Sequence, residues 1–170
     1  MKGPQNSKLN RSPFTFALTL LLLVVAIPPD PGWTTDGEKD LSRLQAKAED
    51  AMAQGDPQGA ANSIGRAALL ASQLAKQSDA TRPRYRIMVD LFRTQEQVYR
   101  AMALFQQSGE RTPVSSGICS LLSLGGQHAA RALENNLPAP EERALDEPLR
   151  WQTMEWLDIA HELQQDWDCR

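Results

Sequence analysis

A long apolar stripe between Pro83 and Ser108 limits the possible folds of this chain more than any other part of its sequence. Tyr85, Phe92 and Tyr99 recur every seven residues, and a neighbouring row of apolar residues, Leu91, Val98 and Phe105, repeats at the same interval. Seven residues make two helical turns, so these side chains lie on one broad face of a helix. An apolar face of this length is typical of a helix at the centre of a bundle.

Four further segments predict helices, because their apolar residues also recur at intervals of three or four. Their expected ranges are 37–54, 57–77, 113–135 and 148–167, with Asp56 and Thr112 as N-caps and Pro57, Pro113 and Pro148 in the first turns. No segment shows the sustained alternation of a strand. We therefore expect an all-α fold in which residues 37–170 form one domain. Its architecture is a five-helix bundle or an array of helical hairpins.

Two adjacent glycines, Gly125 and Gly126, interrupt the fourth predicted helix without changing its apolar register. Each costs about 1 kcal/mol relative to alanine in a helix. We expect one continuous helix here. The glycines then mark either a close crossing with another helix or a hinge.

The N-terminus carries an apolar run of 14 residues, from Phe14 to Ile27. A membrane-spanning helix needs about 20 residues, and Pro28 and Pro29 prevent this run from being extended. Three basic residues and no acidic ones precede it, as in an export signal. We predict a signal peptide over residues 1–26, cut after Ala26, and an extended leader over 27–36. The alternative is an uncleaved membrane anchor.

The predicted mature chain is acidic. The first 26 residues contain three of the 18 basic residues and none of the 21 acidic ones, so their removal leaves a net charge of about −6. Binding to nucleic acid requires a basic face, which makes nucleic acid a poor candidate partner.

Cys119 and Cys169 are the only cysteines. Two cysteines in an exported chain favour a single disulfide, and the alternative is two independent thiols. Cys119 lies early in the fourth predicted helix and Cys169 just after the fifth. An antiparallel hairpin of these helices would bring the two sulfur atoms together, so we expect a disulfide that closes the C-terminal hairpin.

The sequence offers little catalytic chemistry. Neither histidine, His128 or His161, has a second metal ligand at the usual spacing, and both fall on the flanks of their helices rather than in the apolar stripes. No nucleophile elbow, Ser-x-x-Lys motif or phosphate-binding loop is present. We therefore expect no enzyme activity, no metal and no cofactor.

Two features indicate contact with a partner. Arg82, Arg84 and Arg86 predict a cationic strip at the start of the third helix, suited to an acidic protein or a lipid headgroup. Trp151 points roughly opposite the apolar stripe of the fifth helix, and an exposed tryptophan is a favoured interface anchor. The alternatives are a solvated charged face and a tryptophan covered by another helix.

The first predicted hairpin, over residues 41–74, resembles one tetratricopeptide repeat. Gly55 and Asp56 stand at the position of its turn, and the repeat's small and large packing positions are matched by Ala48, Ala60, Ile64 and Ala67. The chain departs from the pattern at three positions, Lys47, Ala51 and Ser72, where the repeat has an apolar residue, an aromatic residue and its closing proline. The resemblance implies a helical hairpin and a bias toward protein–protein contact, and it carries over no functional residues.

These observations predict an exported, non-enzymatic interaction or assembly protein of the periplasm or the cell exterior, with a protein partner. One alternative is a helical bundle that binds a small ligand or a metal. Another is an accessory subunit whose retained N-terminal segment anchors it to a membrane.

Overall fold

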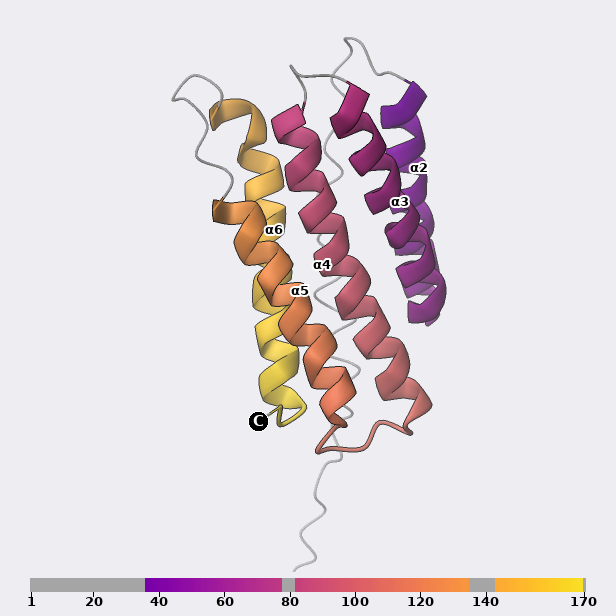
Figure 1. Cartoon of the computed structure of the whole chain (residues 1–170). Helices are drawn as coiled ribbons and strands as arrows, with labels where there is room; N and C mark the ends of the chain where they lie inside the picture. The colour runs from indigo at the N-terminus through magenta and orange to yellow at the C-terminus, as the bar shows by residue number, and fades with distance from the viewer. Residues whose placement is uncertain (1–35, 78–81, 135–142, 170) are drawn as a thin grey trace, which may run out of the picture. The chain divides into compact units, whose positions relative to one another are not determined.

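The computed structural model describes residues 36–77, 82–134 and 143–169, and these form five α-helices with no strand. In chain order the helices are α2 (Asp36–Ala53), α3 (Pro57–Gln77), α4 (Arg82–Gln107), α5 (Ser116–Glu134) and α6 (Arg143–Asp166) (Figure 1). The predicted all-α bundle is therefore confirmed. The predicted signal peptide and nearly all of the predicted leader lie outside the described residues.

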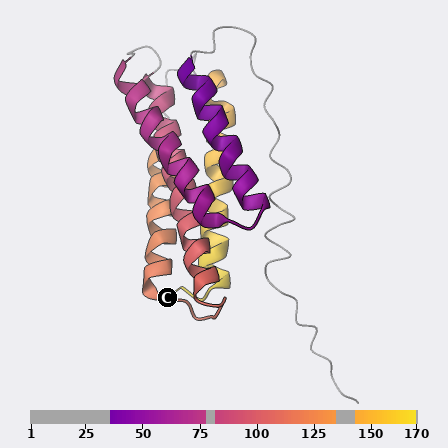
Figure 2. The ribbon, with the colours of Figure 1, turned by 90° about the vertical axis from the view of Figure 1, so that its right-hand side faces the viewer.

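The helices form two layers around α4 (Figures 1 and 2). One layer contains α3, α4 and α5 side by side, with α4 in the middle. In the second layer, α2 packs against α3, and α6 packs against α5 and α4. We call these the three-helix layer and the two-helix layer.

The predicted spine is the core of the bundle. Tyr85, Phe92, Val98, Tyr99 and Phe105 of α4 are all buried, each at most 4% exposed. Small residues of α3, among them Ala60, Ala67, Ala68 and Ala71, are completely buried and allow α3 to approach α4 closely. The apolar periodicity of the sequence thus identifies the helix about which the fold is organised.

Gly125 marks a close crossing of two helices. A Cβ atom at this position would lie 3.4 Å from the Thr94 carbonyl oxygen of α4, and the Thr94 hydroxyl donates to the Gly125 carbonyl at 3.2 Å. The α5 helix continues without interruption through both glycines. Of the two predicted roles, the structure shows the crossing.

Glycine also forms the turn between α2 and α3. Gly55 has a φ of 75°, in the left-handed region, and its amide donates to the Met52 carbonyl, while the Asp56 amide donates to the Ala51 carbonyl. This is the Schellman arrangement that ends many helices. The Asp56 carboxylate then caps α3 by accepting from the Gly59 amide at 2.8 Å, as predicted.

Two predicted helix starts are wrong. The fourth helix begins at Ser116 and not at Pro113, because the Ser115 carbonyl accepts its first bonds and the Val114 amide donates to the Trp167 carbonyl at the end of α6. The last helix begins at Arg143, so Pro148 lies inside it rather than in its first turn. A proline near a helix start removes one backbone hydrogen bond, which a long, packed helix tolerates.

Candidate binding surfaces

The exposed side of α6 carries a large aromatic side chain. Trp151 is 64% exposed and Met154, three residues later, is 39% exposed. Thr153, Trp156 and Ala160 of the same helix are buried and define its inward face. Trp151 is two residues before Thr153, and side chains two apart on a helix do not share a face. The predicted exposure of Trp151 is therefore observed.

Acidic residues surround Trp151 on this face of α6. Glu147 and Glu155 lie four residues before and after it, and Asp158 lies seven residues after it, so all three share its side of the helix. All three are exposed, as is Glu162 one further turn along. We call the surface formed by Trp151, Met154 and these four acids the α6 face.

The rest of α6 is held firmly against the bundle. Trp156 meets the ring of Tyr99 edge-on, with centroids 5.2 Å apart, and Trp167 stacks on Phe105 at 4.3 Å. Edge-on and offset-stacked aromatic pairs stabilise a core beyond the area that they bury. The α6 face is thus presented by a helix whose opposite side is fixed.

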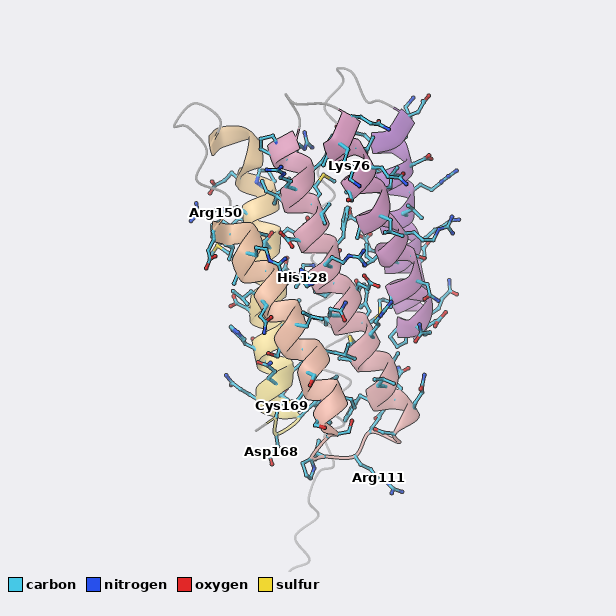
Figure 3. The ribbon with its side chains drawn as sticks, in the orientation of Figure 1. Lys76, Arg111, His128, Arg150, Asp168 and Cys169 are labelled. Carbon is cyan, nitrogen blue, oxygen red and sulfur yellow. A yellow bond between two sulfur atoms is a disulfide. The ribbon has the colours of Figure 1, made fainter. Side chains whose placement is uncertain are left out.

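A disulfide closes the α5–α6 hairpin, as predicted. The Cα atoms of Cys119 and Cys169 lie 5.4 Å apart, across 50 residues of sequence. The Cys169 amide donates to the Gln164 carbonyl, and Asp168 has a positive φ of 53°, so α6 ends in the same arrangement as α2. Figure 3 shows Asp168 and Cys169 at one end of the bundle and Lys76 toward the other.

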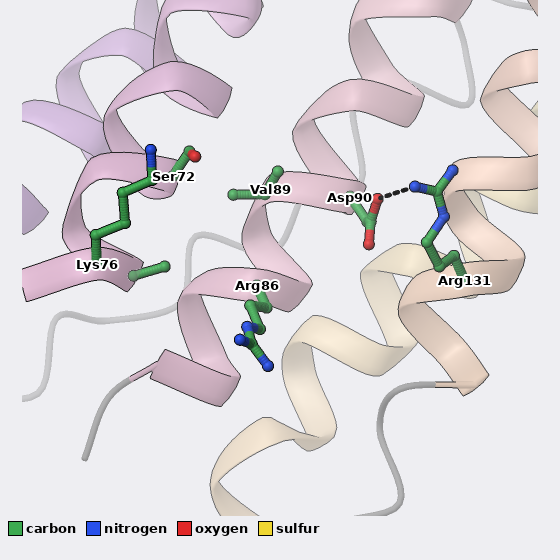
Figure 4. Close-up of a pocket in the computed structure, with 7 residues that line it drawn as sticks. Ser72, Lys76, Arg86, Val89, Asp90 and Arg131 are labelled. Atoms are coloured by element: carbon green, nitrogen blue, oxygen red, sulfur yellow. Dashed lines mark ion pairs between the residues drawn. The ribbon is translucent and has the colours of Figure 1, made fainter. Parts of the chain in front are cut away.

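A second surface is a groove of about 520 Å³ in the three-helix layer, which we call the basic groove. Lys76 and Ser72 of α3 line one side, Arg86, Val89 and Asp90 of α4 lie in the middle, and Arg131 of α5 lies on the other side (Figure 4). Three cations from three helices therefore line one groove, and of these Arg131 is the one drawn in an ion pair with Asp90.

That carboxylate is paired. An Asp90 oxygen lies 3.1 Å from Nδ1 of His128 and 3.9 Å from a guanidinium nitrogen of Arg131. Asp90 and His128 are both largely buried, whereas the Arg131 side chain is 53% exposed. His128 thus lies at a flank, as predicted, but its pairing with Asp90 was not predicted. His161 is exposed, beside Gly126.

The arginines of the predicted cationic strip do not lie on one surface. Arg86 lines the basic groove, whereas Arg84 is exposed and is not part of its lining, and the side chain of Arg82 lies outside the described residues. Residues two apart lie on nearly opposite sides of a helix, so Arg84 and Arg86 cannot form one strip. Lys76 and Arg131 were missed. Each is the basic residue in the last turn of its helix. Because α3 and α5 run antiparallel to α4, their last turns lie beside the start of α4, and this is the signal that could have indicated both residues.

The described part of the chain holds neither a candidate metal site nor a helix suited to spanning a membrane. Within the described ranges, no three His, Cys, Asp or Glu side chains are grouped so that they could hold a metal ion. Within those same ranges, no helix combines the length and hydropathy needed to cross a bilayer.

Comparison with known proteins gives no relative from which a role could be transferred, because no family model, curated protein or solved structure matches the chain.

Proposed function

We propose that this chain is an exported, non-enzymatic interaction protein that binds a partner protein through the α6 face. The observation that carries the proposal is the exposure of Trp151, 64%, on a helix whose other side is packed and closed by a disulfide. Burying a tryptophan on binding contributes more than burying almost any other residue, and a rigid helix loses little entropy when it docks.

The charges around Trp151 define the kind of partner. Glu147, Glu155, Asp158 and Glu162 surround an aromatic and a methionine side chain. The complementary surface is a protein segment with an apolar pocket for the indole ring and lysine or arginine residues at its rim. Complementary charge of this kind accelerates association and selects the partner.

Two observations support export. The N-terminal apolar run is shorter than a membrane span and follows basic residues, as in a cleaved signal. The Cys119–Cys169 disulfide is typical of proteins that fold in an oxidising compartment. We place the protein in the periplasm or outside the cell, with retention of the N-terminal segment as a membrane anchor as the alternative.

The first hairpin is consistent with the proposed role. The α2 and α3 helices resemble a single tetratricopeptide repeat, a unit that other proteins use for protein–protein contact. One repeat cannot bury its own apolar face, and here α3 packs on α4 instead of on a second repeat.

The test is crosslinking in the native cell envelope, followed by capture of the wild-type chain and two variants. Trp151→Ala removes the proposed anchor. Leu69→Ala is the matched control, because Leu69 is 56% exposed but lies on α3. Loss of an interface anchor typically weakens binding by roughly 30-fold or more, so we expect Trp151→Ala to lose a partner that the wild type and Leu69→Ala retain.

A charge variant extends the test. Glu155→Lys/Asp158→Lys reverses two acids of the α6 face and should weaken capture of the same partner. If all variants capture the same proteins in equal amount, or if none captures a stoichiometric partner, the proposed function is wrong.

A further inference from the structure

The basic groove lies in the three-helix layer, whereas the α6 face belongs to the two-helix layer. The proposed partner of the α6 face therefore does not explain why Lys76, Arg86 and Arg131 line one groove. These three residues come from three separate helices, so their place in one groove is a product of the fold and not of one basic stretch of sequence.

The cations of the groove are available to a ligand. Of the ion pairs formed among the described residues, none involves Lys76 or Arg86. Arg131 contacts Asp90 only at 3.9 Å and is half exposed. Asp90 contributes the one negative charge of the lining and is already held by His128. The lining thus has three positive charges and one negative charge, a net charge of +2.

The three-helix layer as a whole is also positively charged, whereas the two-helix layer is negatively charged. The sequences of α3, α4 and α5 contain eight Lys and Arg residues and three acids, a net charge of +5. The sequences of α2 and α6 contain five basic and eleven acidic residues, a net charge of −6. Such a separation of charge guides an anion toward the three-helix layer even though the protein as a whole is acidic.

The donor set fits a phosphate group. The planar guanidinium groups of Arg86 and Arg131 can each donate two parallel hydrogen bonds to phosphate oxygens, Lys76 supplies a compact positive charge, and the Ser72 hydroxyl adds a further donor. A groove of about 520 Å³ is within the range that holds a small molecule or a lipid headgroup. We propose that the basic groove binds a phosphate group, carried either by a soluble compound or by an anionic lipid.

The test uses the protein purified as its own cells process it, with Lys76→Gln/Arg86→Gln as the groove variant. These substitutions remove two positive charges and leave the pairing of Asp90 intact. The matched control is Lys39→Gln/Arg150→Gln, which removes one lysine and one arginine from exposed positions in the two-helix layer. Both variants retain the same N-terminal segment, so a difference in binding between them is due to the groove.

Inorganic phosphate is titrated first, with backbone NMR shifts as the readout. We expect resonances of the groove to move in the wild type and in the control, and the affinity of the groove variant to fall at least about tenfold, because hydrogen bonds to charged groups are lost. Absence of these shifts, or equal affinity in the groove variant and the control, overturns the proposal.

Vesicles then distinguish the two sources of the phosphate group. Retention on phosphatidylglycerol–phosphatidylcholine vesicles that is weakened in the groove variant, but not in the control, identifies a lipid headgroup. Phosphate binding without such retention identifies a soluble phosphorylated ligand.

Discussion

At the scale of single residues, one tightly constrained contact is a buried carboxylate against a glycine. Glu96 of α4 is 3% exposed and is held by Arg93 and Arg100 at 2.5 and 2.6 Å. A Cβ atom on Gly65 of α3 would lie only 2.9 Å from a Glu96 oxygen. Glycine at position 65 therefore makes room for a charge that would be costly to bury without partners.

Gly65→Ala should destabilise the bundle by about 1 kcal/mol, because displacing this carboxylate from its arginines costs more than the helix propensity that alanine adds. Gly126→Ala is the control, since its Cβ would meet its nearest neighbour at an ordinary 3.7 Å. That variant should gain up to about 1 kcal/mol from helix propensity. Denaturant unfolding measures both changes, and equal effects of the two substitutions would contradict this role of Gly65.

The buried hydroxyl of Tyr99 should make the stability of the protein fall at alkaline pH. Burial raises the pKa of its hydroxyl above the ordinary value of 10.0, and the Glu49 carboxylate raises it further. Above about pH 10 the unfolded chain loses this proton while the folded chain keeps it, so stability falls as pH rises, by at most about 1.4 kcal/mol per pH unit from this group. Tyr99→Phe should flatten the decline in unfolding free energy, and an unchanged slope would show that other groups cause it.

At the scale of helices and their connections, the disulfide is the main constraint on the C-terminal hairpin. On the loop-entropy model, a bridge across 50 residues stabilises a protein by about 4 kcal/mol. In denaturant unfolding, the Cys119→Ser/Cys169→Ser variant should lose most of this unfolding free energy. Chemical reduction of the wild type should lower the unfolding free energy by a similar amount. A loss below about 1 kcal/mol would show that the Trp167–Phe105 stack and the backbone bond from Val114 hold this end without the bridge.

The existence of the helices and the start of α3 at Pro57 could be predicted from the sequence, but the starts of α5 and α6 could not. The spacing of Tyr85, Phe92 and Tyr99 identified the central helix, because burial of one face imposes a period on the sequence. Pro113 and Pro148 both suited a first helical turn, but the local pattern of residues does not decide whether a helix begins there. For Pro113 the deciding contact is the bond from Val114 to Trp167, more than 50 residues away.

At the scale of the whole molecule, the sequence predicted one surface better than the other. The exposure of Trp151 follows from its angle to the apolar stripe of its own helix, which is local information. The basic groove depends on which sides of α3, α4 and α5 face one another. That rotation is set by packing, through contacts such as Gly125 on Thr94 and Gly65 on Glu96. The sequence therefore gives the height of Lys76 and Arg131 along the bundle but not the side on which they lie.

The segregation of charge is likewise a property of the assembled bundle. Each helix has a modest net charge, and the layers differ strongly only because the most basic helix, α4, packs between α3 and α5 while both acidic helices lie in the other layer. Opposite charges on the two layers are what the proposed basic partner and the proposed anionic ligand would each require.

We propose that this helical bundle works outside the cytoplasm, and the intact mass of the chain purified from its own cells tests this claim. We predict a chain that begins at Ile27 and is lighter by two hydrogen atoms, which correspond to the Cys119–Cys169 disulfide. A chain that begins at Met1 and carries two free thiols would contradict the claim.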